Sequence, residues 1–190
     1  MLWLLLATGF TGALTLVFAV RWLAHWLGRH PSVAVFHSPK GGCTDAVVYE
    51  IQRARREVLV QAYSFTSKPI AEALIAAKSR GVHVEILLDK SNEQETYTEL
   101  ESFIKEGLAP HIDAQHAIAH NKIMIIDKRT LITGSFNFTH QAEAENAENL
   151  LIIKGHPDLL KSYYESFAAH KAHCQTPKPQ PAHNTQKKAA

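Results

Sequence analysis

The sequence His-Asn-Lys-Ile-Met-Ile-Ile-Asp occupies residues 120–127, and Gly-Ser-Phe-Asn follows at residues 134–137. The four apolar residues at 123–126 are too few for a helix and predict a buried strand that begins just after Lys122. Side chains two positions apart on a strand point the same way. His120 and Lys122 are therefore expected to project from one face of its N-terminal end.

A second apolar run, Thr130 to Thr133, predicts another strand that leads directly into the Gly-Ser-Phe-Asn segment. Gly134 lets the backbone come close to a bound ligand, because it has no Cβ. Ser135 and Asn137 offer a hydroxyl and an amide for hydrogen bonds. An imidazole, an ammonium and two neutral polar groups are thus expected to converge on one site.

This pattern resembles the signature of the phospholipase D superfamily, His-x-Lys-x4-Asp-x6-Gly-Ser-x-Asn. The signature is complete here in His120, Lys122, Asp127, Gly134, Ser135 and Asn137. The resemblance extends from about residue 32 to about residue 170. It is closest to the small bacterial endonucleases that carry one motif per chain, which are similar in length to mitochondrial cardiolipin hydrolase.

The resemblance implies that His120 attacks phosphorus to form a phosphohistidine, while the histidine of a second motif serves as acid. Since the chain carries one motif, the second is expected from a partner, which predicts a homodimer with a shared active site. A monomer in which His111 or His116 is the acid is the competing possibility. Neither of these histidines has a neighbouring Lys and Ser-x-Asn set.

The same resemblance assigns roles to the other motif residues. Lys122, Ser135 and Asn137 are expected to bind the substrate phosphate. Asp127 belongs to the catalytic motif, although its place at the far end of the strand equally favours a structural hydrogen-bonding role. Glu148 matches the acidic residue of the family that hydrogen-bonds the catalytic imidazole, so it is included among the catalytic residues.

Neither a metal ion nor another cofactor is expected in the reaction. The pair His116 and His120 would be half of a metal site on a helix, but no third ligand is apparent in the sequence. The zinc-ligand spacing of some cardiolipin hydrolase relatives is missing. Cys43 and Cys174 form no CxxC pair and are expected to be free thiols, with a disulfide as the alternative.

The chain has 190 residues, of which 46% are hydrophobic and 20% charged, a composition that suits one globular domain. Residues 31–171 are expected to form this catalytic domain, and residues 172–190, rich in Pro, Lys, Gln and Ala, a disordered tail. The net charge of +2 gives no strong basic field. Charge alone therefore leaves the substrate open.

Residues 1–20 contain no charged side chain and are long enough to cross a membrane as a helix. Residues 1–30 are accordingly expected to form an N-terminal hydrophobic helix that anchors the protein in a membrane. Arg21 and Arg29 follow the apolar run, which favours a cytoplasmic catalytic domain under the positive-inside rule. The alternative is a cleaved signal peptide and an exported, periplasmic protein.

The domain pattern is that of an α/β fold with a mixed, mainly parallel sheet flanked by helices on both faces. A strand, helix and strand between residues 57 and 88 form a βαβ unit, which implies parallel strands. Strands are predicted at 33–36, 57–63, 82–88, 123–126, 130–133 and 149–154, and helices from Thr44 or Asp45 to Arg56, from Pro69 to Gly81, at 93–106 and at 157–171.

These features favour a phosphodiesterase, and specifically a nucleic-acid endonuclease. A phospholipase D that cleaves phospholipid headgroups, such as those of cardiolipin or phosphatidylcholine, is the alternative suggested by the hydrophobic segment. A non-catalytic membrane protein that binds nucleic acid is a third possibility, which the intact motif disfavours.

Overall fold

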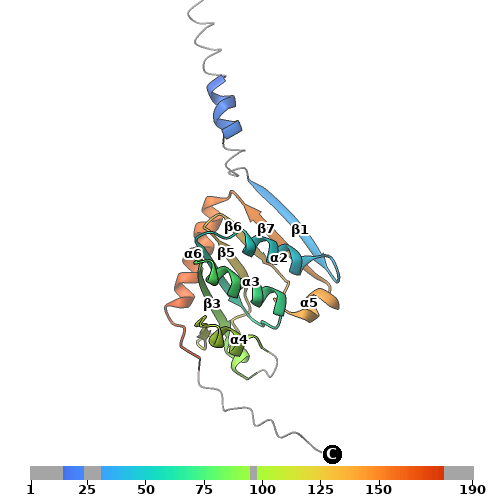
Figure 1. Cartoon of the computed structure of the whole chain (residues 1–190), viewed down its shortest axis with the longest axis vertical. Helices are drawn as coiled ribbons and strands as arrows, with labels where there is room; N and C mark the ends of the chain where they lie inside the picture. Colours follow the sequence, from blue (N-terminus) through green and yellow to red (C-terminus); the bar gives the residue numbers. More distant parts are fainter. Residues whose placement is uncertain (1–14, 24–30, 95–97, 178–190) are drawn as a thin grey trace, which may run out of the picture.

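The computed structural model describes residues 15–23, 31–94 and 98–177 (Figure 1). The strands of the domain are β1 (Ser32–Ser38), β2 (Glu57–Ala62), β3 (His83–Asp89), β4 (His111–Asp113), β5 (Lys122–Ile126), β6 (Thr130–Gly134) and β7 (Glu148–Lys154). The helices are α2 (Cys43–Gln52), α3 (Lys68–Ser79), α4 (Leu100–Lys105), α5 (His140–Ala144) and α6 (Pro157–Lys171), with a 3-10 turn η1 (Lys90–Glu93).

The strands form one seven-stranded sheet in the order β1-β7-β6-β5-β2-β3-β4. The expected βαβ unit is confirmed, because β2 and β3 pair in parallel and are joined through α3. The expectation of a mainly parallel sheet is wrong: in the described part of the chain only β2–β3 and β3–β4 are parallel. The other neighbours are antiparallel. The three residues between β5 and β6 allow a hairpin but no crossover, which parallel strands need.

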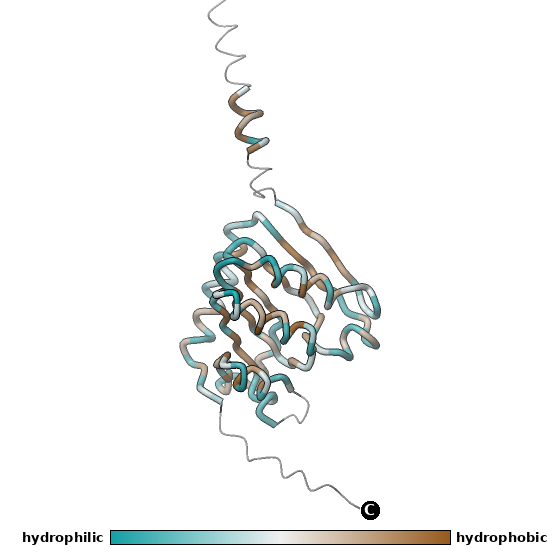
Figure 2. The backbone as a smooth tube through the Cα atoms, viewed as in Figure 1, coloured by the Kyte–Doolittle hydropathy of each residue, from teal (hydrophilic) through white to brown (hydrophobic). Residues whose placement is uncertain are grey.

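Helices cover both faces of the sheet, as predicted (Figure 1). Alternate residues of β2 illustrate this: Val58 and Val60 pack in the larger core with α2 and α3, whereas Leu59 packs in a smaller core with Leu160 and Phe167 of α6. This alternation follows from the period of two along a strand. Figure 2 shows the hydrophobic residues concentrated along the central strands between the helices.

Two helices differ from their predicted bounds by four residues or more. Helix α2 ends at Gln52, four residues before the predicted end, and its first turn is not capped by Thr44 or Asp45. Instead the carboxylate of Glu143 accepts hydrogen bonds from the backbone N–H groups of Gly42 (3.0 Å) and Thr44 (2.7 Å). A distant side chain thus supplies the cap that local sequence was expected to supply. Helix α4 begins only at Leu100.

The predicted terminal segments are only partly described. Residues 15–23 are helical, and no described helix has both the length and the hydropathy needed to cross a bilayer. Most of the predicted hydrophobic segment, residues 1–14, lies outside the described residues. At the other end, Gln175 pairs with Ile112 beside β4, which holds this residue of the predicted tail against the domain. Residues 178–190 also lie outside the described residues. Cys43 and Cys174 are free thiols.

Candidate active site

The pairing of three central strands brings the motif residues to one edge of the sheet. In the β5–β6 hairpin Ile123 lies opposite Thr133, and in the next pair Gly134 lies opposite Leu150. The first residue of β5, the last of β6 and the first of β7 consequently lie at the same edge. These residues are Lys122, Gly134 and Glu148.

Lys122 is the fixed cation of this edge. Its side chain is 7% exposed, and its Nζ donates a hydrogen bond to the carbonyl of His120 at 3.0 Å. Nζ also lies 5.2 Å from the centre of the Tyr63 ring. Burial lowers the pKa of Lys122, and the negative charge of Glu148 acts in the opposite direction. An ammonium held this firmly can pair with a phosphoryl oxygen without first being ordered.

His120 lies just before β5 and is exposed, so its imidazole is open to an incoming substrate. Its ring contacts Tyr63, with 4.7 Å between the ring centres. Hydrogen bonds hold the backbone on both sides: Ala119 N–H donates to the carboxylate of Asp89 at 2.7 Å, and Tyr63 N–H donates to the carbonyl of Asn121 at 2.9 Å. The loop therefore positions the imidazole although His120 is outside the strand.

The Gly-Ser-Phe-Asn segment lies across the start of β7. A Cβ on Gly134, whose φ is +147°, would lie 2.3 Å from the carbonyl oxygen of Asn149, so the close approach is to β7 and not to a ligand as expected. The Ser135 hydroxyl accepts a hydrogen bond from Asn149 N–H at 3.0 Å. Asn137 differs, because its buried Oδ1 has no hydrogen-bond partner among the described residues. The amide oxygen of Asn137 is thus an acceptor in this segment that is not used by any described residue.

Glu148 lies at the site and interacts electrostatically with Lys122. Its Oε1 accepts a hydrogen bond from Asn146 Nδ2 at 3.1 Å. The expected hydrogen bond to His120 is not among the contacts of Glu148 in the described part of the chain. Within one chain the interaction of Glu148 with the site is with the charge of Lys122, and its predicted contact with a catalytic imidazole stays a prediction.

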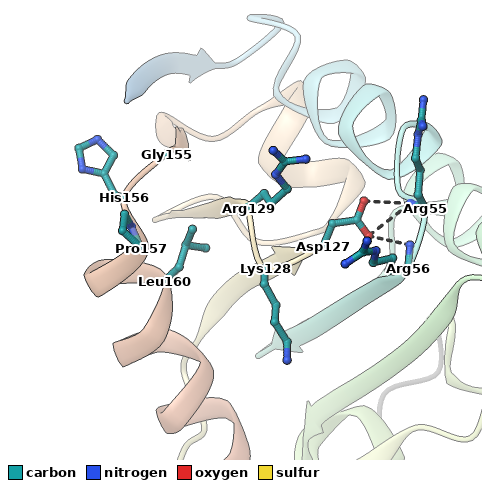
Figure 3. A pocket seen from close by; sticks show the side chains of 9 residues that line it. All are labelled: Arg55, Arg56, Asp127, Lys128, Arg129, Gly155, His156, Pro157 and Leu160. Carbon is teal, nitrogen blue, oxygen red and sulfur yellow. Dashed lines mark hydrogen bonds between the residues drawn. The ribbon is translucent and has the colours of Figure 1, made fainter. Parts of the chain in front are cut away.

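The structure does not bring Asp127 to this edge. Asp127 follows the last residue of β5, roughly 16 Å from Lys122 at the usual rise per strand residue. Its carboxylate accepts hydrogen bonds from the backbone N–H groups of Arg55 (3.0 Å), Arg56 (2.7 Å) and Glu57 (3.0 Å). Figure 3 shows it turned toward Arg55 and Arg56 beside a pocket at this opposite end. Its contacts join the β5–β6 turn to the start of β2, in agreement with the structural alternative.

Three supporting residues were missed in the sequence. Tyr63 contacts both His120 and Lys122, Asp89 holds the loop before His120, and Asn92 donates to the Tyr63 carbonyl at 2.6 Å. Asp89 and Asn92 are almost fully buried. One signal was available: Asp89 directly follows the apolar strand residues Leu87 and Leu88, and a carboxylate there must have hydrogen-bond partners when buried.

Together these groups can bind and attack a phosphate diester. An exposed imidazole can act as nucleophile, and the adjacent ammonium and the N–H groups of an amide can donate hydrogen bonds to the non-bridging oxygens. The side chains suited to a metal ion, among the residues that the structure describes, form a separate cluster that contains His116 but not His120.

Comparison with known proteins agrees with this chemistry. Residues 47–171 match the family described as "Cardiolipin synthase, PLD-like domain". Phospholipase D of Rickettsia conorii is 41% identical over 140 residues, which are 74% of this chain and 70% of the relative. Mitochondrial cardiolipin hydrolase of Mus musculus is 26% identical over 195 residues, covering 87% of this chain and 88% of the relative.

Among solved structures, Nuc of Salmonella typhimurium, a phospholipase D family member, superposes with a TM-score of 0.74 and is 34% identical. The match covers 79% of this chain and all of Nuc. The fold, the complete motif and these matches establish that the chain belongs to the phospholipase D superfamily, as one of its phosphodiesterases.

Proposed function

We propose that this phosphodiesterase is a nucleic-acid endonuclease that works through a phosphohistidine intermediate. The observation that carries the reaction is the exposed His120 imidazole beside the buried Lys122 ammonium. A ring nitrogen of His120 attacks phosphorus, and the bond from phosphorus to the departing oxygen breaks. Water then attacks the phosphohistidine, which releases the phosphate monoester and restores the imidazole. Lys122 and Asn137 bind the non-bridging oxygens in both steps.

The departing oxygen must receive a proton, and this requirement supports a homodimer. His120 cannot attack phosphorus and protonate the opposite side at once, so a second imidazole must face it across the phosphate. A two-fold axis beside the site supplies a second His120 and Lys122 without further sequence. The same imidazole then accepts a proton from water in the second step.

Mixing of subunits tests the shared site. An excess of His120→Ala chains added to wild type, under conditions of subunit exchange, should lower activity more than dilution does, because each mixed dimer lacks one imidazole. Activity in proportion to the wild-type fraction, together with a monomeric mass at the assay concentration, would exclude the dimer and favour His111 or His116 as the acid.

The place where the N-terminal segment joins the domain, at Ser32, supports nucleic acid over phospholipid as the substrate. Ser32 pairs with Lys154 and Ser38 with Glu148, so β1 enters the sheet at the end opposite the catalytic edge (Figure 1). The six steps of β1 separate these ends by about 20 Å. An N-terminal membrane anchor, which we also propose, would join the domain at the end remote from its site. The alternative of an exported protein after signal cleavage makes the same substrate prediction.

The second candidate is a phospholipase D that acts on phospholipid headgroups. It is favoured by the names of the relatives from Rickettsia conorii and Mus musculus, phospholipase D and mitochondrial cardiolipin hydrolase. The chemical steps at His120 are the same for both substrates. The two candidates differ only in the groups that are esterified to the phosphate, which are nucleosides in one case and lipid and headgroup in the other.

One preparation assayed on three substrates decides between them. Single-stranded nucleic acid, duplex, and vesicles that contain cardiolipin or phosphatidylcholine are compared, with His120→Asn as the blank. Cleavage of nucleic acid above the blank and no headgroup release from vesicles is the expected result. Headgroup release alone would replace this proposal with the lipase. No turnover of any of these, nor of bis-p-nitrophenyl phosphate, would instead indicate a non-catalytic binding protein.

A further inference from the structure

A second cluster of chemically active side chains lies apart from the proposed catalytic groups. It consists of Asp113, His116, His170 and His173. Asp113 is the last residue of β4 and its side chain is 2% exposed. His116 lies in the bend that follows, whereas His170 is in the last turn of α6 and His173 in the turn after it. Two segments that are distant in sequence therefore meet here.

The four side chains converge on one point. The Asp113 carboxylate lies 3.0 Å from His116 Nδ1, 2.7 Å from His170 Nδ1 and 3.3 Å from His173 Nε2. The ring centres are 4.7 Å apart for His116 and His170, and 5.4 Å apart for His170 and His173. One ligand atom from each residue can be chosen so that all lie within 4.8 Å of one another.

Hydrogen bonds alone leave this arrangement incompletely satisfied. His116 and His170 bond to the carboxylate, but the buried Nε2 of His173, although 3.3 Å from it, makes no hydrogen bond of acceptable geometry to any described residue. Three protonated imidazoles would repel one another around a single carboxylate. In a neutral imidazole one ring nitrogen carries a lone pair, and in the tautomer that turns it toward the centre this nitrogen can bind a metal ion but not the carboxylate. A cation at the centre would use all three nitrogens and the carboxylate oxygen.

We propose that Asp113, His116, His170 and His173 bind a divalent transition-metal ion of the zinc class. Imidazole nitrogen with carboxylate oxygen is a donor set that zinc accepts in tetrahedral sites. Metal–ligand distances of about 2.0–2.2 Å place neighbouring ligand atoms of a tetrahedron roughly 3.3 Å apart. The present separations from the Asp113 carboxylate, 2.7 to 3.3 Å, are up to about 0.6 Å shorter than this value, and all four ligand atoms lie within 4.8 Å of one another, so rotations of these side chains would bring them to tetrahedral spacing.

The ion would join α6 to the edge of the sheet. His170 lies in the last turn of α6 and His173 in the turn after it, and Asp113 ends the edge strand β4, next to the bridge between Ile112 and Gln175. His116 begins the loop that ends at His120. The four residue steps from His116 to His120 span at most about 14 Å. The ion would fix the start of this loop from a position outside the phosphate site. This inference goes beyond the proposed endonuclease and does not depend on it.

The test is metal binding by the full chain, purified with a removable tag that contains no histidine. Elemental analysis should find one zinc ion per chain, and the apo protein should regain one Zn²⁺ on titration. Co²⁺ should give the intense visible absorption of a tetrahedral complex. Zn²⁺ should also raise the melting temperature of the apo protein. None of these measurements uses phosphodiesterase activity.

Variants identify the ligands. His116→Asn and His173→Asn should each lose the stoichiometric zinc, the cobalt spectrum and the zinc-dependent rise in melting temperature. His140→Asn, at an exposed histidine on α5, is the matched control and should keep all three. Because the His116 side chain is 43% exposed, its replacement should leave apo folding, followed by circular dichroism, unchanged.

Two results would overturn the proposal. One is apo wild-type protein that binds neither Zn²⁺ nor Co²⁺ and does not change its melting temperature. The other is stoichiometric zinc that persists in both folded ligand variants, since the ion would then be bound by other residues.

Discussion

Asp127→Asn separates the structural role of this residue from a role in the reaction. The carboxylate accepts hydrogen bonds from three backbone N–H groups, those of Arg55, Arg56 and Glu57. Asparagine keeps one acceptor oxygen but loses the charge. It also tolerates the positive φ of 53° at this position, so backbone strain is not added. The substitution therefore tests the charged hydrogen bonds of this carboxylate without added backbone strain.

The expected loss of stability follows from these contacts. A hydrogen bond to a charged group contributes about 1.5–3 kcal/mol when buried. Water can reach the Arg55 and Arg56 groups, which are exposed, while the bond to Glu57 is partly buried. We therefore expect a total loss of about 2 kcal/mol and not the sum of three buried bonds. With a urea m-value of about 2 kcal/mol/M, the unfolding midpoint falls by roughly 1 M.

Urea unfolding and turnover of bis-p-nitrophenyl phosphate, measured on the same samples, form the assay. Below the unfolding transition, Asp127→Asn should keep near wild-type kcat. Asp158→Asn, at an exposed carboxylate in the first turn of α6, is the control and should cost only about 0.3–1 kcal/mol. A folded Asp127→Asn protein with an unchanged midpoint and activity as low as that of His120→Ala would refute the structural assignment.

Three further predictions concern the catalytic edge. Lys122→Ala should lower kcat by about 10²-fold or more, because the fixed ammonium stabilises the transition-state charge; circular dichroism checks that the variant is folded. The pKa of Lys122 lies below its ordinary value of 10.5. Activity should therefore fall as the pH rises through this lowered pKa, because the lysine loses its positive charge. Removal of the opposing charge in Glu148→Gln should move this alkaline limb of the kcat/KM profile to still lower pH, whereas Glu145→Gln should leave it in place. An unmoved limb in Glu148→Gln would contradict the electrostatic role of that residue. Gly134→Ala should destabilise the fold by about 1–3 kcal/mol or more in urea unfolding, because its Cβ would lie 2.3 Å from the Asn149 carbonyl oxygen and φ is +147°. Wild-type stability would show that the backbone relaxes without cost.

The sequence alone identified most elements of the domain correctly. Helix α6 has its predicted bounds, and the strands at β2, β3, β5 and β6 differ from prediction by one residue or so. Such elements depend on local periodicity and on nearby Pro and Gly residues, which are visible in sequence. The start of helix α2 was misplaced because its cap comes from Glu143 on another helix.

The spacing of the motif also determined the family and the residues at its site, because His120, Lys122 and the Gly-Ser-Phe-Asn segment are read from one continuous stretch. Only the tertiary structure decided what surrounds them. Strand pairing places Asp127 at the opposite end of the sheet and Glu148 near Lys122. It likewise brings His170 and His173 of the last helix and turn to Asp113. Spacing within a segment follows from covalent geometry, whereas contacts between distant segments depend on how the chain packs its two cores.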